Sequence, residues 1–263
     1  MHTRIVTETE VTHLQGFNQR TVVVDDISVA GTHEPFVEHV SFTAPRGEVT
    51  VVPTDPGIPQ VALALAIGGR VELMRGRIRV GAGSDLADLQ LRTRLVDVAD
   101  VTAPEDTIAV KAVVEEELAL AEKPAGRAAV AAFLEAHDLS DRATRPWEQL
   151  PAGVRTSLLL ELGALHPMVR VLVLAGPERH GGDQTVWLET CRRLAETGLA
   201  VIVLTAAATA ASLPADLASA DDTAHDTADD TAYDTAVDTA DEPDEADPAA
   251  DADEPNLPKE PSA

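Results

Sequence analysis

The amino-acid sequence predicts an α/β protein with a strand-rich beginning, a helical middle and a parallel sheet completed near the end. Two observations lead to this prediction. Residues 51–66 form an apolar strand, a Pro/Gly turn and an Ala/Leu-rich helix in direct succession. Residues 169–205 contain strand, helix and strand with short connections, which is the unit that builds parallel sheets.

The beginning of the chain has four short segments with the apolar pattern of strands. Turns that contain Gly31, Gly47 and Gly76 separate them. The predicted strands are residues 21–24, 36–42, 49–52 and 77–80.

The middle and end of the chain predict helices and then the parallel unit. Residues 110–137 are rich in Ala, Glu, Leu and Lys and predict helices interrupted at Pro124 and Gly126. A helix over 157–165 is apolar on nearly all sides, so we expect it to be buried. The parallel unit is predicted as a strand at 169–174, a helix at 187–196 and a strand at 199–205.

Composition restricts the compartment of this 263-residue chain. The single cysteine, Cys191, excludes an intrachain disulfide framework and favours a reducing compartment, so we expect a cytoplasmic protein. We interpret the thiol as structural, not nucleophilic. Residues 1–20 are polar with charges of both signs, and we expect an N-terminal extension and no signal peptide. No apolar run approaches the roughly 20 residues that cross a bilayer.

The net charge of −25 is concentrated at the end of the chain. Residues 211–263 are rich in Asp and Glu, with Lys259 as their only Lys or Arg residue, and contain tandem Asp-Thr-Ala-x repeats that begin at Asp222. Low-complexity sequence of this charge cannot bury enough apolar surface to offset its ordering entropy, so we expect a disordered acidic tail. No basic patch of the kind that binds nucleic acid is evident, so no nucleic-acid partner is expected.

The stretch over residues 51–66 has the layout of a phosphate-binding P-loop without its chemistry. The pattern G-x-x-x-x-G-K-[ST] supplies backbone N–H groups, a lysine and a magnesium-binding hydroxyl. Thr54, Pro59, Gln60 and Val61 stand at the four defining positions. The candidate nucleotide-binding positions are Thr54, Asp55, Pro56, Gly57, Ile58, Pro59, Gln60 and Val61.

Over about residues 22–208, the order of these segments resembles an ATP-binding cassette (ABC) nucleotide-binding domain. Residues 40–52 and 76–81 resemble the strands on either side of the family's P-loop helix. The remaining resemblances are a signature-like segment (Leu150, Pro151, Ala152, Gly153 and Val154), a Walker B-like segment ending at Ala175 and Gly176, a D-loop-like Asp183, and Ala206 at the switch position.

The resemblance implies a P-loop NTPase-like ABC ATPase core over residues 21–210. It also implies an antiparallel β part near the beginning and a helical subdomain at about 100–150. Trp147 is interpreted as a packing anchor between the helical and core parts.

The departures from the family pattern are systematic. Pro59 has no N–H to donate, Gln60 carries no charge, Asp55 places a negative charge where phosphates would lie, and Val61 cannot hold magnesium.

The other motifs have lost their family residues as well. Ala175 and Gly176 replace the two Walker B acids, Ala206 replaces the switch histidine, and Pro151 and Ala152 replace signature residues. Only Asp97 or Asp100 lies near the place of the glutamine loop. We interpret Glu178, His180 and Asp183 as solvated loop residues, and we expect no metal site.

This combination predicts a degenerate ABC-type subunit without catalytic residues. The resemblance implies docking on a membrane permease at the inner face of the cell membrane, or pairing with a second ABC-type subunit as a homo- or heterodimer. No cofactor is expected, although Thr54 and Gln60 leave room for weak binding of ATP and Mg. Two alternatives stay open: an ATPase with a rearranged site that energises transport, and a soluble interaction module that works through its acidic tail.

Overall fold

The computed structural model describes residues 22–215 and 217–219. The predicted extension over residues 1–20 and nearly all of the predicted tail over 211–263 lie outside the described residues. The described part contains one antiparallel and one parallel sheet, which confirms the predicted fold class.

The antiparallel sheet is built from the predicted strands at the beginning of the chain. It contains β1 (Val22–Val29), β2 (Val37–Ala44) and β4 (Arg75–Val80) in the order β2-β1-β4. Strand β1 alternates buried and partly exposed residues at its start, as a strand does when only one of its faces is covered. The buried face of this sheet packs on the core.

The parallel sheet brings together segments that are far apart in the sequence. Its strands are β5 (Thr93–Val96), β6 (Val171–Ala175), β7 (Ala200–Thr205), β3 (Val49–Pro53) and β8 (Ala218–Ser219), in the order β5-β6-β7-β3-β8. Val49 of β3 pairs with Val201 of β7. All of the described pairings in this sheet are parallel, so its strands end at one common edge, called here the carboxyl edge.

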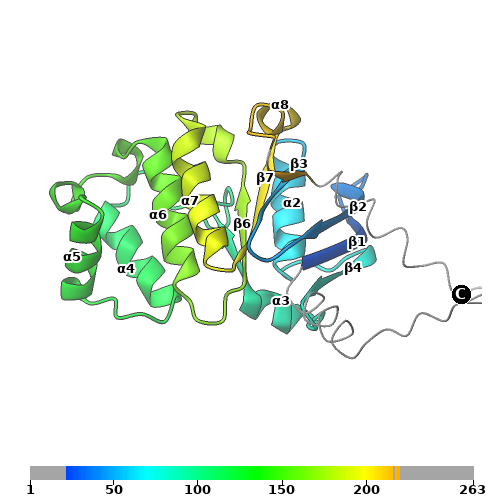
Figure 1. Ribbon diagram of the computed structural model, residues 1–263, viewed down its shortest axis with the longest axis horizontal. Helices are drawn as coiled ribbons and strands as arrows, with labels where there is room; N and C mark the ends of the chain where they lie inside the picture. The colour runs from blue at the N-terminus through cyan, green and yellow to red at the C-terminus, as the bar shows by residue number, and fades with distance from the viewer. Residues whose placement is uncertain (1–21, 216, 220–263) are drawn as a thin grey trace, which may run out of the picture. The chain divides into compact units, whose positions relative to one another are not determined.

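Helices cover both faces of the parallel sheet. In Figure 1, α6 (Ala152–Ala164) and α7 (Gln184–Glu196) lie on one face, and α2 (Ile58–Ile67) lies on the other with the antiparallel sheet beside it. Helices α4 (Val110–Leu120) and α5 (Arg127–Ala136) lie beyond α6, within the range predicted for the helical subdomain. The remaining helices are short: α3 (Leu86–Arg92), α8 (Ala207–Ala210) and the 3-10 turns η1 (Ser140–Arg142), η2 (Trp147–Gln149) and η3 (Pro177–His180).

Alternation along the central strands divides the core into two clusters. Val171 and Val173 of β6 pack on the side of α2, and Leu172 and Leu174 pack on the side of α6 and α7. All four side chains are buried. A strand covered on both faces reads as a continuous apolar run, and residues 171–175 have this pattern.

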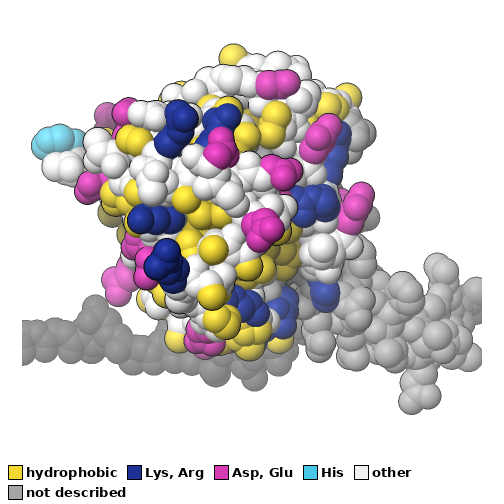
Figure 2. All heavy atoms as spheres, turned by 90° about the vertical axis from the view of Figure 1, so that its left-hand side faces the viewer, with side chains coloured by type: hydrophobic (Ala, Val, Ile, Leu, Met, Phe, Trp, Pro, Cys, Tyr) yellow, Lys and Arg dark blue, Asp and Glu magenta, His cyan; other side chains and the backbone are white. Residues whose placement is uncertain are grey.

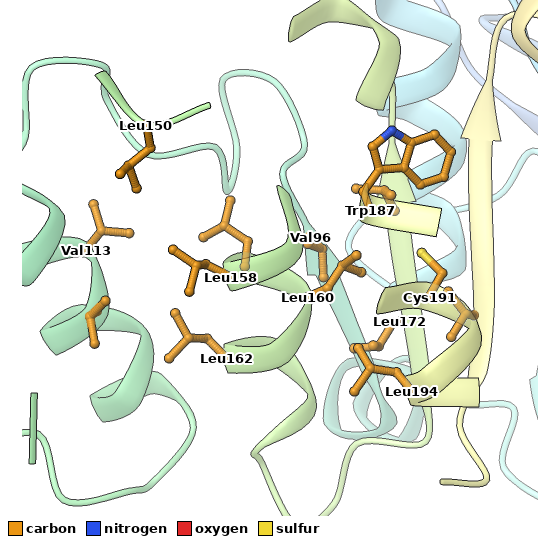
Figure 3. Close-up of a cluster of buried hydrophobic side chains, with 14 of the residues drawn as sticks. Val96, Val113, Leu150, Leu158, Leu160, Leu162, Leu172, Trp187, Cys191 and Leu194 are labelled. Atoms are coloured by element: carbon orange, nitrogen blue, oxygen red, sulfur yellow. The ribbon is translucent and has the colours of Figure 1, made fainter. Parts of the chain in front are cut away.

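Helix α6 is buried on two sides, as its sequence predicts. Figure 3 shows Leu158 and Leu162 on the side of α4, and Leu160 beside Val96 and Leu172 of the sheet. Helix α6 therefore joins the helical part to the sheet through leucine packing.

The aromatic and sulfur side chains complete the same core cluster. Trp147, Trp187 and Cys191 are all buried within it. Burial raises the pKa of the Cys191 thiol to about 12. This confirms the interpretation of Cys191 as a structural residue and of Trp147 as a packing residue.

The structure extends several predicted elements and adds others, which are α3, β5, the short α8 and β8, and the 3-10 turns. Strand β1 continues to Val29, and α6 and α7 begin earlier than predicted. Helix α7 begins at Gln184 because Asp183 caps it: its carboxylate accepts the Thr185 N–H. Helix α3 and strand β5 were not predicted, because an amphipathic helix capped by Asp85 runs directly into a strand without a Gly or Pro between them.

Candidate functional site

The carboxyl edge gathers the loops that follow β3, β5, β6 and β7. In parallel α/β sheets, ligand sites form beyond the carboxyl ends of the strands. Ala175, at the end of β6, pairs with Leu204 of β7, and Pro53, at the end of β3, pairs with Thr205. The P-loop-like, Walker B-like and switch positions therefore lie at neighbouring strand ends.

The first N–H group of the P-loop-like turn is hydrogen-bonded within the protein. The Thr54 N–H donates to the Thr205 carbonyl over 2.8 Å, and the Thr54 hydroxyl donates to the Val52 carbonyl over 3.2 Å. Gly57 has a φ of 86°, a conformation that favours glycine, and directly precedes α2. Asp55, Pro56, Gly57 and Ile58 are exposed; Thr54, Pro59 and Val61 are partly buried, and Gln60 is buried.

The side chain of Glu178 fills the space between the P-loop-like helix and the end of β7. Its carboxylate accepts hydrogen bonds from Gln60 Nε2 at 3.0 Å, from Thr205 Oγ1 at 2.7 Å and from the Ala206 N–H at 2.9 Å. These donors come from α2, from the last residue of β7 and from the residue after it. We call Gln60, Glu178, Thr205 and Ala206 the Glu178 network. It is an anion site whose anion is supplied by the chain itself.

The network keeps the carboxylate ionised. Partial burial raises the pKa of Glu178, but the hydrogen bonds from Thr205, Gln60, the Glu178 backbone and Ala206 together outweigh burial. The net effect holds the pKa below its usual value of 4.5. A negative charge therefore stays fixed at the carboxyl edge at neutral pH.

This direction predicts a pH dependence of stability. Because the folded pKa lies below the unfolded one, the stabilising contribution is complete above about pH 4.5 and is lost as the pH falls through the folded pKa. Urea denaturation at about pH 6 and about pH 3.5 should therefore show a smaller acid-induced loss of unfolding free energy for Glu178→Gln than for the wild type. Equal losses would contradict this assignment.

A second network lies beside the first and involves the residue after β5. The buried Asp97 accepts from Arg179 Nη2 at 2.6 Å and lies 3.0 Å from His180 Nε2. Arg179 Nη1 also donates to the Ala175 carbonyl over 2.7 Å. Of the two aspartates considered for the glutamine-loop place, the structure therefore brings Asp97 to the site and leaves Asp100 exposed.

The position after Ala175 disfavours any side chain, because of its left-handed backbone and its closeness to the Gln60 amide. Gly176 has a φ of 63°, and a Cβ atom there would lie 2.8 Å from Gln60 Oε1. The backbone at Gly176 is thus built for glycine. The side chain of Ala175 is buried and carries no polar atom, so only its carbonyl is available at the edge.

These residues do not fit a magnesium-bound nucleotide phosphate. The Gln60 amide and the Ala206 N–H, which would face a phosphate, already donate to Glu178. An added phosphate would meet the charge of this carboxylate as well as Asp55. Among the described residues, no group of three or more His, Cys, Asp or Glu side chains could hold a metal ion.

The signature-like and D-loop-like positions pack against each other, away from this network. A Cβ atom on Gly153 of α6 would lie 2.8 Å from the Val186 Cβ of α7, so glycine allows the two helices to approach closely. Asp183 caps α7, and its hydrogen bonds from Thr185 lower its pKa. Leu150 is buried; Ala152 and Val154 are partly buried and Pro151 is exposed. Within residues 22–219, no hydrogen bond given by the structure joins these residues to the Glu178 network.

The interpretation of Glu178 and His180 as solvated loop residues was wrong. Both are partly buried and hydrogen-bonded. The 3-10 turn η3, which begins at the buried Pro177, folds these side chains back over the sheet edge. A sequence signal was present in the Gly176-Pro177 pair, since a left-handed glycine followed by proline reverses the chain. For Asp183, exposure agrees with the prediction.

Comparison with solved structures finds a similar fold in ABC transporter ATP-binding proteins. An ATP-binding subunit of an ABC transporter matches with a TM-score of 0.52 and 20% identity, over 72% of this chain and 81% of that chain. A putative ABC transporter ATP-binding protein from Pyrococcus furiosus matches with a TM-score of 0.56 and 15% identity, over 77% and 98%. The chain has the fold of an ABC ATP-binding subunit. No family model and no curated protein matches the sequence. At these identities the ABC likeness concerns the fold, and the side chains decide the chemistry.

Proposed function

We propose that this protein is a non-catalytic ABC-type subunit that keeps the cassette fold as a docking body. Its partner would be a membrane permease or a second ABC-type subunit. It would work in the cytoplasm at the inner face of the cell membrane, and it would need neither a cofactor nor a metal.

The observation that carries this proposal is the Glu178 network. Phosphoryl transfer relies on positioning and charge stabilisation by a cation, a metal and a water-orienting group. At the carboxyl edge, Gln60 stands in the place of the cation, Ala175 in that of the metal-associated acid, and the three donors are engaged by an internal carboxylate. This arrangement supports a site that stabilises the fold and does not bind a phosphate.

Calorimetry with ATP and magnesium tests the loss of nucleotide chemistry. We expect no binding tighter than about 1 mM, and no phosphate release above the uncatalysed background. The Gln60→Ala variant should behave in the same way. Micromolar affinity, with turnover that Gln60→Ala abolishes, would refute the proposal.

The competing candidate is an ATPase with a rearranged site, and Glu178 itself is the observation that favours it. A carboxylate at this edge could orient a water molecule once its donors were drawn away by a nucleotide. Turnover would be measured for the wild type and Glu178→Gln, alone and with any cassette protein that co-purifies. Turnover that disappears in Glu178→Gln would establish the competing candidate.

The surface supports a protein partner more than nucleic acid. Figure 2 shows the helical side of the molecule, where Lys and Arg side chains are interspersed with Asp, Glu and hydrophobic ones. Such a face lacks the continuous positive potential that phosphate backbones require. No helix in the described part of the chain is long and apolar enough to cross a membrane.

Docking can be tested through the genes adjacent to this one. If one of them encodes a multi-span membrane protein, we expect the full chain to co-purify with it in detergent after the two proteins are co-expressed. A chain that ends at residue 219, which keeps β8, serves as the comparison. Retained capture would support the folded domain as the docking part, and capture lost with the tail would favour the alternative interaction module.

A further inference from the structure

A cavity of about 140 Å³ lies at the opposite end of the parallel sheet from the Glu178 network. It is bounded by the start of β5, the residues before β6, and the ends of α2, α4 and α6. Its polar lining includes Arg70, Arg94, Glu117 and His166. A water molecule takes up about 30 Å³ in the liquid, so the cavity suits an ion of a few heavy atoms and not a drug-sized ligand.

Two guanidinium groups reach this cavity because glycines make room for them. A Cβ atom on Gly68 would lie 2.4 Å from Arg70 Nη1, and one on Gly163 would lie 3.0 Å from Arg94 Cγ. Arg70 Nη1 donates to the Gly68 carbonyl over 2.7 Å, which folds the guanidinium back toward the sheet. Both arginines are therefore held in place before any ligand arrives.

The charges in the cavity do not balance. Arg94 Nη2 pairs with Glu117 Oε2 at 2.6 Å, and both side chains are largely buried. Arg70 has no carboxylate partner among the described residues, and its single hydrogen bond leaves most of its N–H groups unused. Arg70 is exposed at the surface of the cavity, so a ligand can reach its guanidinium from solvent. The protein that surrounds its base and the neighbouring charge of Arg94 both lower the pKa of Arg70.

The mouth of the cavity is apolar. Leu91 and Leu120, which line it, have exposed fractions of 44% and 51%. Leu162 and Val169 continue this lining inside. A ligand with one oxyanion group and a short apolar remainder would match both the unbalanced charge and the apolar mouth.

We propose that this cavity binds a small oxyanion, of the carboxylate or phosphate type, with Arg70 as its principal ligand and Arg94 beside it. The guanidinium fork of Arg70 suits the planar or tetrahedral oxygen pairs of such ions. Glu117 keeps Arg94 oriented and neutralises its charge, and His166 Nε2 lies 3.7 Å from Glu122 Oε1. Arg70 therefore supplies the unpaired positive charge, and a monoanion is favoured. The site is independent of the proposed docking function.

Thermal denaturation of the full chain tests the site with acetate, butyrate and inorganic phosphate as probes, at an ionic strength held constant with sodium chloride. We expect a saturable rise in Tm for the wild type. In Arg70→Met the apparent affinity should fall by about tenfold or more, because the charge-assisted hydrogen bonds are lost. Arg77→Met is the matched control, since Arg77 is an exposed arginine paired with Asp25, and it should respond like the wild type.

The probes distinguish the sources of the oxyanion. Butyrate that acts at lower concentration than acetate would assign a carboxylate with an apolar remainder, and a response to phosphate would assign a phosphate group. Arg70→Lys keeps the charge without the fork and provides a second variant should Arg70→Met fold poorly; its affinity should be intermediate. The proposal is overturned if no probe raises the wild-type Tm, or if the Arg70 variants respond as strongly as the wild type.

Discussion

Glu178→Ala is expected to lower the free energy of unfolding by about 3 kcal/mol. The substitution leaves the Gln60 amide, the Thr205 hydroxyl and the Ala206 N–H without their shared acceptor. Gln60 and Thr205 are buried, and each buried donor without a partner costs roughly 1–3 kcal/mol, less where water can enter. Urea denaturation followed by the fluorescence of Trp147 and Trp187, which are buried in the folded protein, measures the loss.

Two comparison variants separate this effect from the loss of an ordinary glutamate. Glu189 is exposed and has no polar partner among the described residues, so Glu189→Ala should change stability by less than about 0.5 kcal/mol. Glu178→Gln keeps one acceptor oxygen and should fall between Glu178→Ala and the wild type. A Glu178→Ala variant as stable as Glu189→Ala would show that the network does not hold the sheet edge together.

Arg94→Met is expected to cost about 3–5 kcal/mol near pH 8, because it leaves the carboxylate of Glu117 buried without its cation. Burial already raises the pKa of Glu117, although Arg94 opposes this rise. Without Arg94 the pKa should rise further. The destabilisation should therefore shrink as the pH falls and Glu117 becomes protonated.

The double variant Arg94→Met with Glu117→Met provides the control. It removes both charges and keeps similar side-chain volume, so it should recover most of the lost stability. Measurements at about pH 8 and about pH 5 give the pH dependence. If Arg94→Met lowers the free energy of unfolding by the same amount at both pH values, the loss does not come from the unpaired carboxylate of Glu117.

The sequence predicted the scaffold well because apolar patterns report burial directly. The apolar run at residues 169–174 indicated a central strand, and the leucines of residues 157–165 indicated a buried helix. The order of these segments then led to the ABC-type fold. These inferences depend on local periodicity, which a single sequence contains.

The interactions at the carboxyl edge could not be predicted in the same way. Gln60 and Glu178 lie far apart in the sequence, and their hydrogen bond depends on the left-handed turn at Gly176. The motif comparison identified the absence of acidic residues at Ala175 and Gly176. It did not identify Glu178 as the carboxylate that accepts the hydrogen bonds at this edge. Likewise, the pairing of Asp97 with Arg179 required the sheet order, which places β5 beside β6.

The pairing of β3 with β7 also affects how the protein is made. Strand β3 precedes the P-loop-like turn near the beginning of the chain. Val49 can pair with Val201 only after Val201 has left the ribosome. At roughly 5–20 residues per second, this delay lasts on the order of ten seconds. During synthesis, the valine-rich β3 therefore has unpaired strand edges until its partner β7 has been made. A substitution that prevents β7 from folding would therefore also leave β3, which is translated much earlier, without its partner strand.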